Sequence, residues 1–109
     1  MNAATKKRLE MAGWKFGTAA ELLGLEPAEE AYIELKVRLA VQLAELRQKL
    51  RMSQKAVAKR TGSSQSRVAK MEIADASVSL DLLVRSLLAL GAKAKEIETA
   101  IDHAVSSNK

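Results

Sequence analysis

The chain of 109 residues contains no cysteine, a single proline and one residue of each aromatic type. Without cysteine it forms no disulfide bond and no cysteine-ligated zinc site. With so few aromatic side chains, the core has to be built from leucine, alanine, valine and isoleucine, within a sequence that is 48% hydrophobic. This usage favours an all-α fold. The length suits one domain with one core.

Sequence signals for membranes, catalysis and cofactors are also scarce. No apolar run is long enough to span a membrane, and residues 1–12 lack the hydrophobic region of a signal peptide. We therefore expect a cytoplasmic protein with no membrane partner. The only histidine, His103, has no catalytic partner in sequence, because the adjacent Asp102 points elsewhere on a helix. The sequence also has no phosphate-binding glycine loop and no metal-ligand spacing. We therefore expect that the protein is not an enzyme, has no catalytic residue, and binds no metal or cofactor.

Positive charge is concentrated in the middle of this chain, whose net charge is +5. Between residues 36 and 70, Glu45 is the only acid, whereas the other acids lie nearer the two ends. A charge-rich stretch is often only a solvated face, but this one coincides with the motif described next, as a phosphate-facing surface requires. Its basic residues are Lys36, Arg38, Arg47, Lys49, Arg51, Lys55, Lys59, Arg60, Arg67 and Lys70.

Residues 52–72 have the pattern of two short helices joined by a tight turn. Ser53 is a good N-cap for a helix that begins at Gln54. With this cap, the amide end of the helix remains free to face a phosphate. Gly62 falls where the backbone must turn sharply, in a left-handed conformation that strains other residues. Either Ser63 or Ser64 then caps the second helix.

The two predicted helices divide into an inner and an outer face. Ala58 has to be small, because the second helix crosses the first there at a steep angle. Val68 and Met71 are three residues apart and face the core. A short polar outer face suits the DNA major groove, which admits one helix and rewards amide and ammonium donors. The outward residues are Gln65, Ser66, Ala69 and Lys70.

This segment resembles the Xre/Cro/CI group of helix-turn-helix regulators, the domain type of the lambdoid phage repressors. The resemblance covers about residues 35–97 and includes an S-Q-x-x-V-A opening, the central glycine and the run S-R-V-A-K-M-E. It implies an all-α, five- to six-helix, lambda-repressor-like domain at residues 29–109, with its motif at about 53–73. Residues 1–28 are expected to form an N-terminal extension with a short helix.

The resemblance also implies contacts with double-stranded DNA. Gln54 occupies the family's phosphate-contacting position, and the base-reading positions fall on Gln65, Ser66 and Lys70. From their side-chain chemistry we expect Gln65 to be able to pair with adenine and Lys70 with guanine, although the sequence does not define the operator. Further residues expected at phosphates or at the flank of the second helix are Lys55, Ser64 and Arg67.

Other motif positions are expected to have a structural role. In phage repressors of this type an arginine of the first domain helix pairs with a glutamate that ends the second motif helix, and here these positions are Arg47 and Glu72. Thr61 and Ser63 depart from the family, because aliphatic residues are usual at both positions. The remaining structural positions of the motif are Ala58, Gly62, Val68 and Met71.

A long helix is predicted from Pro27 to about Leu50, with Pro27 in its first turn. One apolar stripe suits the domain core, and a second stripe is more than one core face needs. The second stripe is covered by a helix at residues 18–24, with a capping box at Thr18 and Glu21, by a second copy of the chain, or by another protein. The stripes are Leu35, Leu39, Leu43, Leu46 and Leu50, and Ile33, Val37, Ala40, Val41 and Ala44.

Two more helices follow the motif. Ser79 is predicted to cap a helix that runs through Leu90 and stops at Gly91, and the last helix covers about residues 93–105. The apolar side of the last helix is either core or a dimer seam. We expect a homodimer, since one helix reads too few base pairs, and a two-fold pair reads half-sites about 34 Å apart. The apolar sets are Leu80, Leu83, Val84, Leu87 and Leu88, and Ile97, Ala100, Ile101, Ala104 and Val105.

The overall layout resembles HigA-like antitoxins, which repress their own operon and pair with toxins of the RelE/HigB type. The excess apolar surface and the N-terminal extension favour this reading over a minimal phage repressor. The expected function is therefore a sequence-specific transcriptional repressor that acts as the antitoxin of a type II toxin-antitoxin pair. The alternatives are a prophage-type Cro/CI-like repressor without a toxin, and a protein-binding adaptor that does not read DNA.

Overall fold

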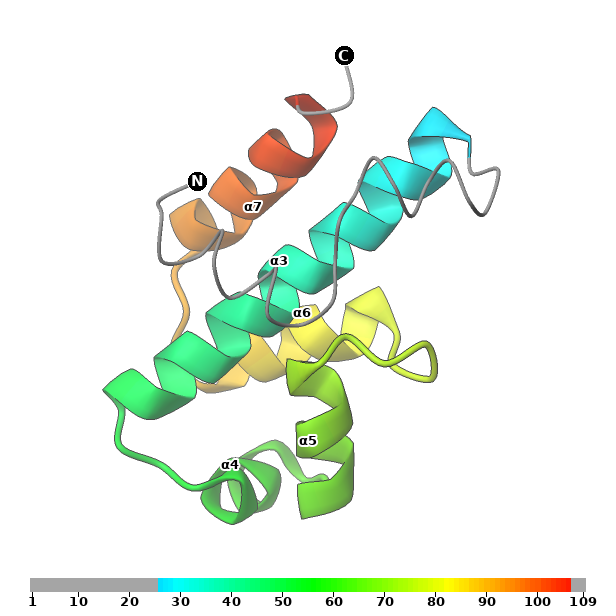
Figure 1. The fold of residues 1–109 in the computed structure, drawn as a ribbon. Helices are drawn as coiled ribbons and strands as arrows, with labels where there is room; N and C mark the ends of the chain where they lie inside the picture. Colours follow the sequence, from blue (N-terminus) through cyan, green and yellow to red (C-terminus); the bar gives the residue numbers. More distant parts are fainter. Residues whose placement is uncertain (1–25, 107–109) are drawn as a thin grey trace.

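The computed structural model describes residues 26–106, in which the chain forms five α-helices and no strand (Figure 1). The all-α prediction is therefore confirmed. The helices are α3 (Pro27–Lys49), α4 (Gln54–Thr61), α5 (Gln65–Glu72), α6 (Leu80–Ala89) and α7 (Ala94–Ser106). None of these five helices is long and apolar enough to cross a membrane. The predicted capping box at Thr18 and Glu21 lies outside the described residues.

Helix α3 is the central element, and α5, α6 and α7 all pack against it (Figure 1). Its start and end follow the sequence signals: Pro27 lies in the first turn with Glu29 and Glu30, and Arg47 and Lys49 lie in the last turn. These charges oppose the partial charges of the helix ends.

Both apolar stripes of α3 are largely buried in the single chain. Leu39 and Leu43 of the first stripe are almost fully buried, but Leu50 is 43% exposed, so its assignment to the core was wrong. Leu50 follows the last turn of α3 as its C-cap and is no longer held against the core. Three members of the second stripe, Val37, Ala40 and Val41, join the same core cluster as Ala100 of α7. The buried members of this stripe are Val37, Ala40, Val41 and Ala44.

Helix α7 provides part of the cover for α3, but its apolar side is divided. Ala100 and Ala104 are buried, whereas Ile101 is 44% and Val105 is 49% exposed. The amide nitrogen of Gln42 on α3 also donates to the carbonyl oxygen of Glu96 near the start of α7, at 3.0 Å. The apolar side of α7 therefore lies in the core at Ala100 and Ala104, and Ile97 packs partly buried against the core, whereas Ile101 and Val105 face solvent.

Helix α6 has the predicted boundaries and nearly the predicted face. The Oγ of Ser79 accepts the N–H of Leu82 at 3.1 Å, and Leu83 and Leu87 are fully buried. Leu88 is 53% exposed, so its place on the core face was wrong. Leu90, just after the last turn, is buried instead.

Asp75 organises the loop between α5 and α6. Its Oδ2 accepts hydrogen bonds from the backbone N–H of Ser77 at 2.9 Å and from the Ser77 hydroxyl at 2.5 Å. These bonds, the hydroxyl bond above all, hold the pKa of Asp75 below its ordinary value of 3.8.

We expect Ser77→Ala to lower the thermal unfolding midpoint at neutral pH but not in acid. A carboxylate with a lowered folded pKa stabilises the fold above its unfolded pKa, and this contribution disappears as the pH falls through the folded pKa, below 3.8. Circular dichroism melts recorded from pH 7 down through the acid range below 3.8 should therefore converge for the two proteins. Ser106→Ala, at an exposed serine of α7, is the control without such a pH dependence. A difference for Ser77→Ala that stays constant with pH would contradict this role of Asp75.

Candidate nucleic-acid interface

Helices α4 and α5 are joined and capped by the residues that the sequence indicates. The Oγ of Ser53 accepts the N–H of Ala56 at 3.0 Å. Gly62 ends α4 with φ 68° and ψ 34°, a left-handed conformation, and its N–H bonds to the carbonyl oxygen of Ala58. Of the two serines proposed as the second cap, Ser64 performs this role, because its Oγ accepts the N–H of Arg67 at 3.1 Å.

The inner faces of α4 and α5 lie in the core as predicted. Val57, Val68 and Met71 have no exposed surface, and Ala58 is 4% exposed. The hydroxyl of Ser86 on α6 also donates to the Met71 sulfur at 3.3 Å. This packing fixes the rotation of α5 about its own axis, and therefore determines which of its residues face outward.

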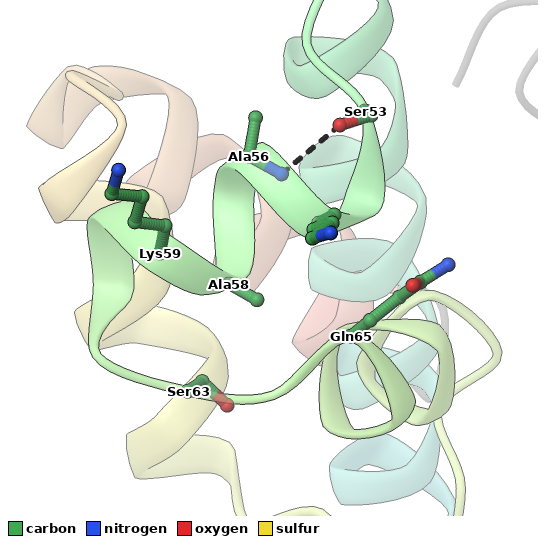
Figure 2. A pocket seen from close by; sticks show the side chains of 7 residues that line it. Ser53, Ala56, Ala58, Lys59, Ser63 and Gln65 are labelled. Atoms are coloured by element: carbon green, nitrogen blue, oxygen red, sulfur yellow. Dashed lines mark hydrogen bonds between the residues drawn. The ribbon is translucent and has the colours of Figure 1, made fainter.

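The polar face of α5 is open to solvent. Gln65, Ser66, Arg67 and Lys70 are all exposed, whereas Ala69 is only partly exposed. Gln65 extends away from the body of α5 at its first turn (Figure 2). The structure therefore brings the predicted base-reading side chains together on one accessible surface of one helix.

A hollow of about 630 Å³ opens beside α4 and the turn that leads into α5 (Figure 2). No acid lines it, and neither α4 nor α5 has an acidic residue in its first turn. The positive ends of both helix dipoles are therefore uncompensated on this side, which suits an anion such as a phosphate. The lining residues are Ser53, Lys55, Ala56, Ala58, Lys59, Ser63 and Gln65.

Lys59 shares this hollow with Lys55 but was not among the predicted phosphate-contacting residues. Its position one helical turn after Lys55 was the signal that could have identified it, because residues four apart lie on the same side of a helix.

The two polar departures from the family pattern have different environments. The hydroxyl of Thr61 donates to the carbonyl oxygen of Val57, one turn earlier in α4, at 2.8 Å. The Oγ of Ser63 is buried without a hydrogen-bond partner in the described part of the chain. Thr61 is thus compatible with a tightly packed turn, because its polar atom is satisfied locally.

The predicted ion pair between α3 and α5 is present. Arg47 Nε lies 2.5 Å from Glu72 Oε2, and Arg47 Nη2 lies 3.1 Å from Oε1. The two side chains are only 18% and 9% exposed. The hydrogen bond to Glu72, more than the charge attraction, raises the pKa of Arg47 above its ordinary value. Arg47 Nη1 also donates to the carbonyl oxygen of Met52 at 3.1 Å, just before α4.

The same carboxylate contacts a predicted DNA-binding residue. Nε2 of Gln54, the first residue of α4, donates to Glu72 Oε1 at 3.2 Å. Glu72 therefore links α3, α4 and α5 through two partners distant in sequence.

Three of the basic residues from 36 to 70 do not contribute freely to a phosphate-facing surface, which corrects the charge argument made from the sequence. Lys36 and Arg38 are buried, with 9% and 8% exposure. Arg38 pairs with Glu34 at 2.9 Å, and Lys36 donates to the carbonyl oxygen of Asp75 at 3.4 Å. Arg47 is committed to its ion pair. The exposed members are Lys49, Arg51, Lys55, Lys59, Arg60, Arg67 and Lys70.

Over residues 26–106, no group of three or more histidine, aspartate or glutamate side chains is arranged to hold a metal ion.

The helix-turn-helix domain family matches residues 38–100, which is more than half of the chain. No curated protein and no solved structure matches the chain. The matched region begins on α3, ends on α7 and contains the whole of α4 and α5. The chain therefore belongs to the helix-turn-helix domain family and is a DNA-binding regulator.

Proposed function

We propose that this regulator is a sequence-specific transcriptional repressor of the Xre/Cro/CI type. The observation that carries the proposal is the asymmetry of α5. Val68 and Met71 are completely buried, while Gln65, Ser66 and Lys70 are exposed together. One face of this helix is anchored in the core. The other face presents amide, hydroxyl and ammonium groups, which can form hydrogen bonds with base edges in the major groove.

Phosphate contacts would hold α5 in register on the duplex without reading its sequence. We assign these contacts to Gln54, Lys55, Ser64 and Arg67, with Lys59 added because it lies in the same hollow as Lys55. Repression then follows from occupancy, because a promoter covered by the protein is not available to the transcription machinery.

The test is a titration of the purified chain into the DNA upstream of its own gene, with a scrambled duplex of equal length as the control. An autorepressor binds the upstream DNA more tightly, and its affinity falls steeply as the salt concentration rises. Equal, weak binding to both duplexes would contradict recognition of that operator. A complete lack of DNA binding at low salt would favour the adaptor instead.

We further propose that the repressor binds DNA as a homodimer. A single α5 covers only one half-site, and two half-sites about 34 Å apart match a two-fold pair of such helices. The exposed side chains of Ile101 and Val105 on α7 are candidates for the seam. Ile101→Glu should give a monomer in sedimentation equilibrium and weaken operator binding, whereas Thr99→Glu, at an exposed polar residue of the same helix, should do neither. A wild-type chain that is monomeric on and off the operator would contradict the dimer.

The second candidate is an autoregulating, HigA-like antitoxin that also binds a RelE/HigB-type toxin. It is favoured by an apolar groove of about 330 Å³ between α3 and the loop after α5. The groove includes Tyr32, which is 47% exposed, and Ala74. The second stripe of α3 no longer supports this candidate, since the chain itself buries most of it. Co-expression with the product of the adjacent gene, followed by size-exclusion chromatography, tests it. A stable complex supports an antitoxin, and separate elution leaves the plain repressor.

A further inference from the structure

We propose that Glu72 is a positioning residue for DNA binding, which orients the side-chain amide of Gln54 towards a backbone phosphate. This inference rests on the proposed DNA-binding function and on the phosphate contact assigned to Gln54. It adds a role for a residue that faces the interior and would not itself touch DNA.

The contacts of the carboxylate support this role. Glu72 Oε2 accepts from Arg47 Nε, and Oε1 accepts from both Arg47 Nη2 and Gln54 Nε2, the last at 3.2 Å. Arg47 lies in the last turn of α3. Its two hydrogen bonds hold the carboxylate of Glu72 in the position from which it contacts Gln54 of α4. With a side chain only 9% exposed, Glu72 has little freedom to move.

A carboxylate selects one orientation of a neighbouring amide. An ionised carboxylate only accepts hydrogen bonds, so Gln54 has to present its nitrogen rather than its oxygen to Glu72. One N–H is then used by Glu72, and the second remains available to an outside acceptor. A phosphate also only accepts hydrogen bonds, so an amide free to rotate would present its oxygen part of the time and lose this contact.

Arg47 makes an acid tolerable at this position. A lone carboxylate one hydrogen bond away from a phosphate-contacting side chain would repel the phosphate. Glu72 lies instead in a two-bond pair with a guanidinium, which neutralises the local charge, while Oε1 accepts from Gln54 as well as from Arg47. The pair therefore orients Gln54 without adding net negative charge to the DNA-facing side.

The test is a double-mutant cycle of Glu72→Gln and Gln54→Ala, measured as the Kd for a random-sequence duplex of about 20 base pairs at low salt. Glutamine at position 72 keeps the shape but presents both a donor and an acceptor, so it no longer selects the orientation of Gln54. We expect Glu72→Gln to raise Kd about three- to fivefold, the size of one hydrogen bond. In the Gln54→Ala background the same change should leave Kd unaltered.

The control is Glu45→Gln, which removes the same charge from an exposed residue of α3. Removing an acid from a protein that binds a polyanion should leave Kd unchanged or lower it. Tighter or unchanged binding by Glu72→Gln would overturn the inference, because electrostatics alone predicts that result. An equal weakening in the presence and absence of Gln54 would also overturn it, since Glu72 would then act only on the fold.

Circular dichroism verifies that Glu72→Gln is folded at the assay temperature. If it is not, Gln54→Asn replaces it, since an amide one methylene shorter at this half-buried position is expected to lie too far from Glu72 for the 3.2 Å bond. Gln54→Asn should raise Kd as much as Gln54→Ala does, and wild-type affinity would overturn the inference. A wild-type chain that binds no duplex would instead refute the proposed function itself.

Discussion

Replacing Arg47 with alanine is expected to lower the free energy of unfolding by about 2–4 kcal/mol, near the lower end for breaking a buried ion pair. The reason is the environment of Glu72, whose side chain is 9% exposed and would be left without its cation. The carbonyl oxygen of Met52 would lose a donor as well. Because the pair links α3 to α5, its loss also removes a restraint on the helix that is proposed to read DNA.

Thermal unfolding followed by circular dichroism measures this effect. For a domain of this size, the expected loss corresponds to a fall of about 10–20 °C in the unfolding midpoint. The matched control is Arg85→Ala, which breaks an ion pair with Asp81 whose side chains are 78% and 73% exposed. That surface pair should contribute less than about 1 kcal/mol. Equal midpoints for the two variants would show that the Arg47 pair has no special structural role.

Replacing Gln65 with alanine is expected to weaken binding to the true operator by about 1–3 kcal/mol and to leave binding to random DNA almost unchanged. Gln65 is exposed at the first turn of α5, where a side-chain amide can make two hydrogen bonds with an adenine edge. A base contact of this kind exists only on the matching sequence, so its loss reduces specificity rather than general affinity.

Fluorescence anisotropy with an operator selected from a random pool, and with a scrambled duplex, measures both affinities. The matched control is Lys55→Ala on α4, which removes a charge from the hollow and should weaken binding to both duplexes. It should also make the dependence on salt concentration less steep by about one counterion. Equal losses on both duplexes for Gln65→Ala would contradict its role as a base-reading residue.

The motif was predicted well because its signals are local. The cap at Ser53, the left-handed turn at Gly62 and the burial of Val68 and Met71 all appear where expected. Each depends on backbone conformation or helical periodicity within a few residues, which the sequence displays directly. The sequence left both Ser63 and Ser64 open as the second cap, since adjacent serines give the same local signal.

The errors concern residues whose burial or exposure the apolar and basic patterns of the sequence did not reveal. Leu50 and Leu88 continue apolar patterns but are exposed, because α3 ends before one and no described helix covers the other. Lys36 and Arg38 belong to a basic stretch but are buried, one bonded to the loop at Asp75 and the other paired within α3. Net charge along the chain does not reveal which side of a helix each charge occupies.

The contacts of Gln54 are another case in which sequence was insufficient. Its candidate role as a phosphate contact followed from its position in the motif, but its bond to Glu72 joins residues 18 positions apart. Local sequence thus sufficed for the helices, their caps and the polar face of α5, since these follow from hydrogen bonding and periodicity over one or two turns. The cover of α3 by α7 and the bond of Gln54 to the Arg47–Glu72 pair, a pair already expected from the family pattern, depended on how the helices pack, because burial and pairing are properties of their mutual arrangement.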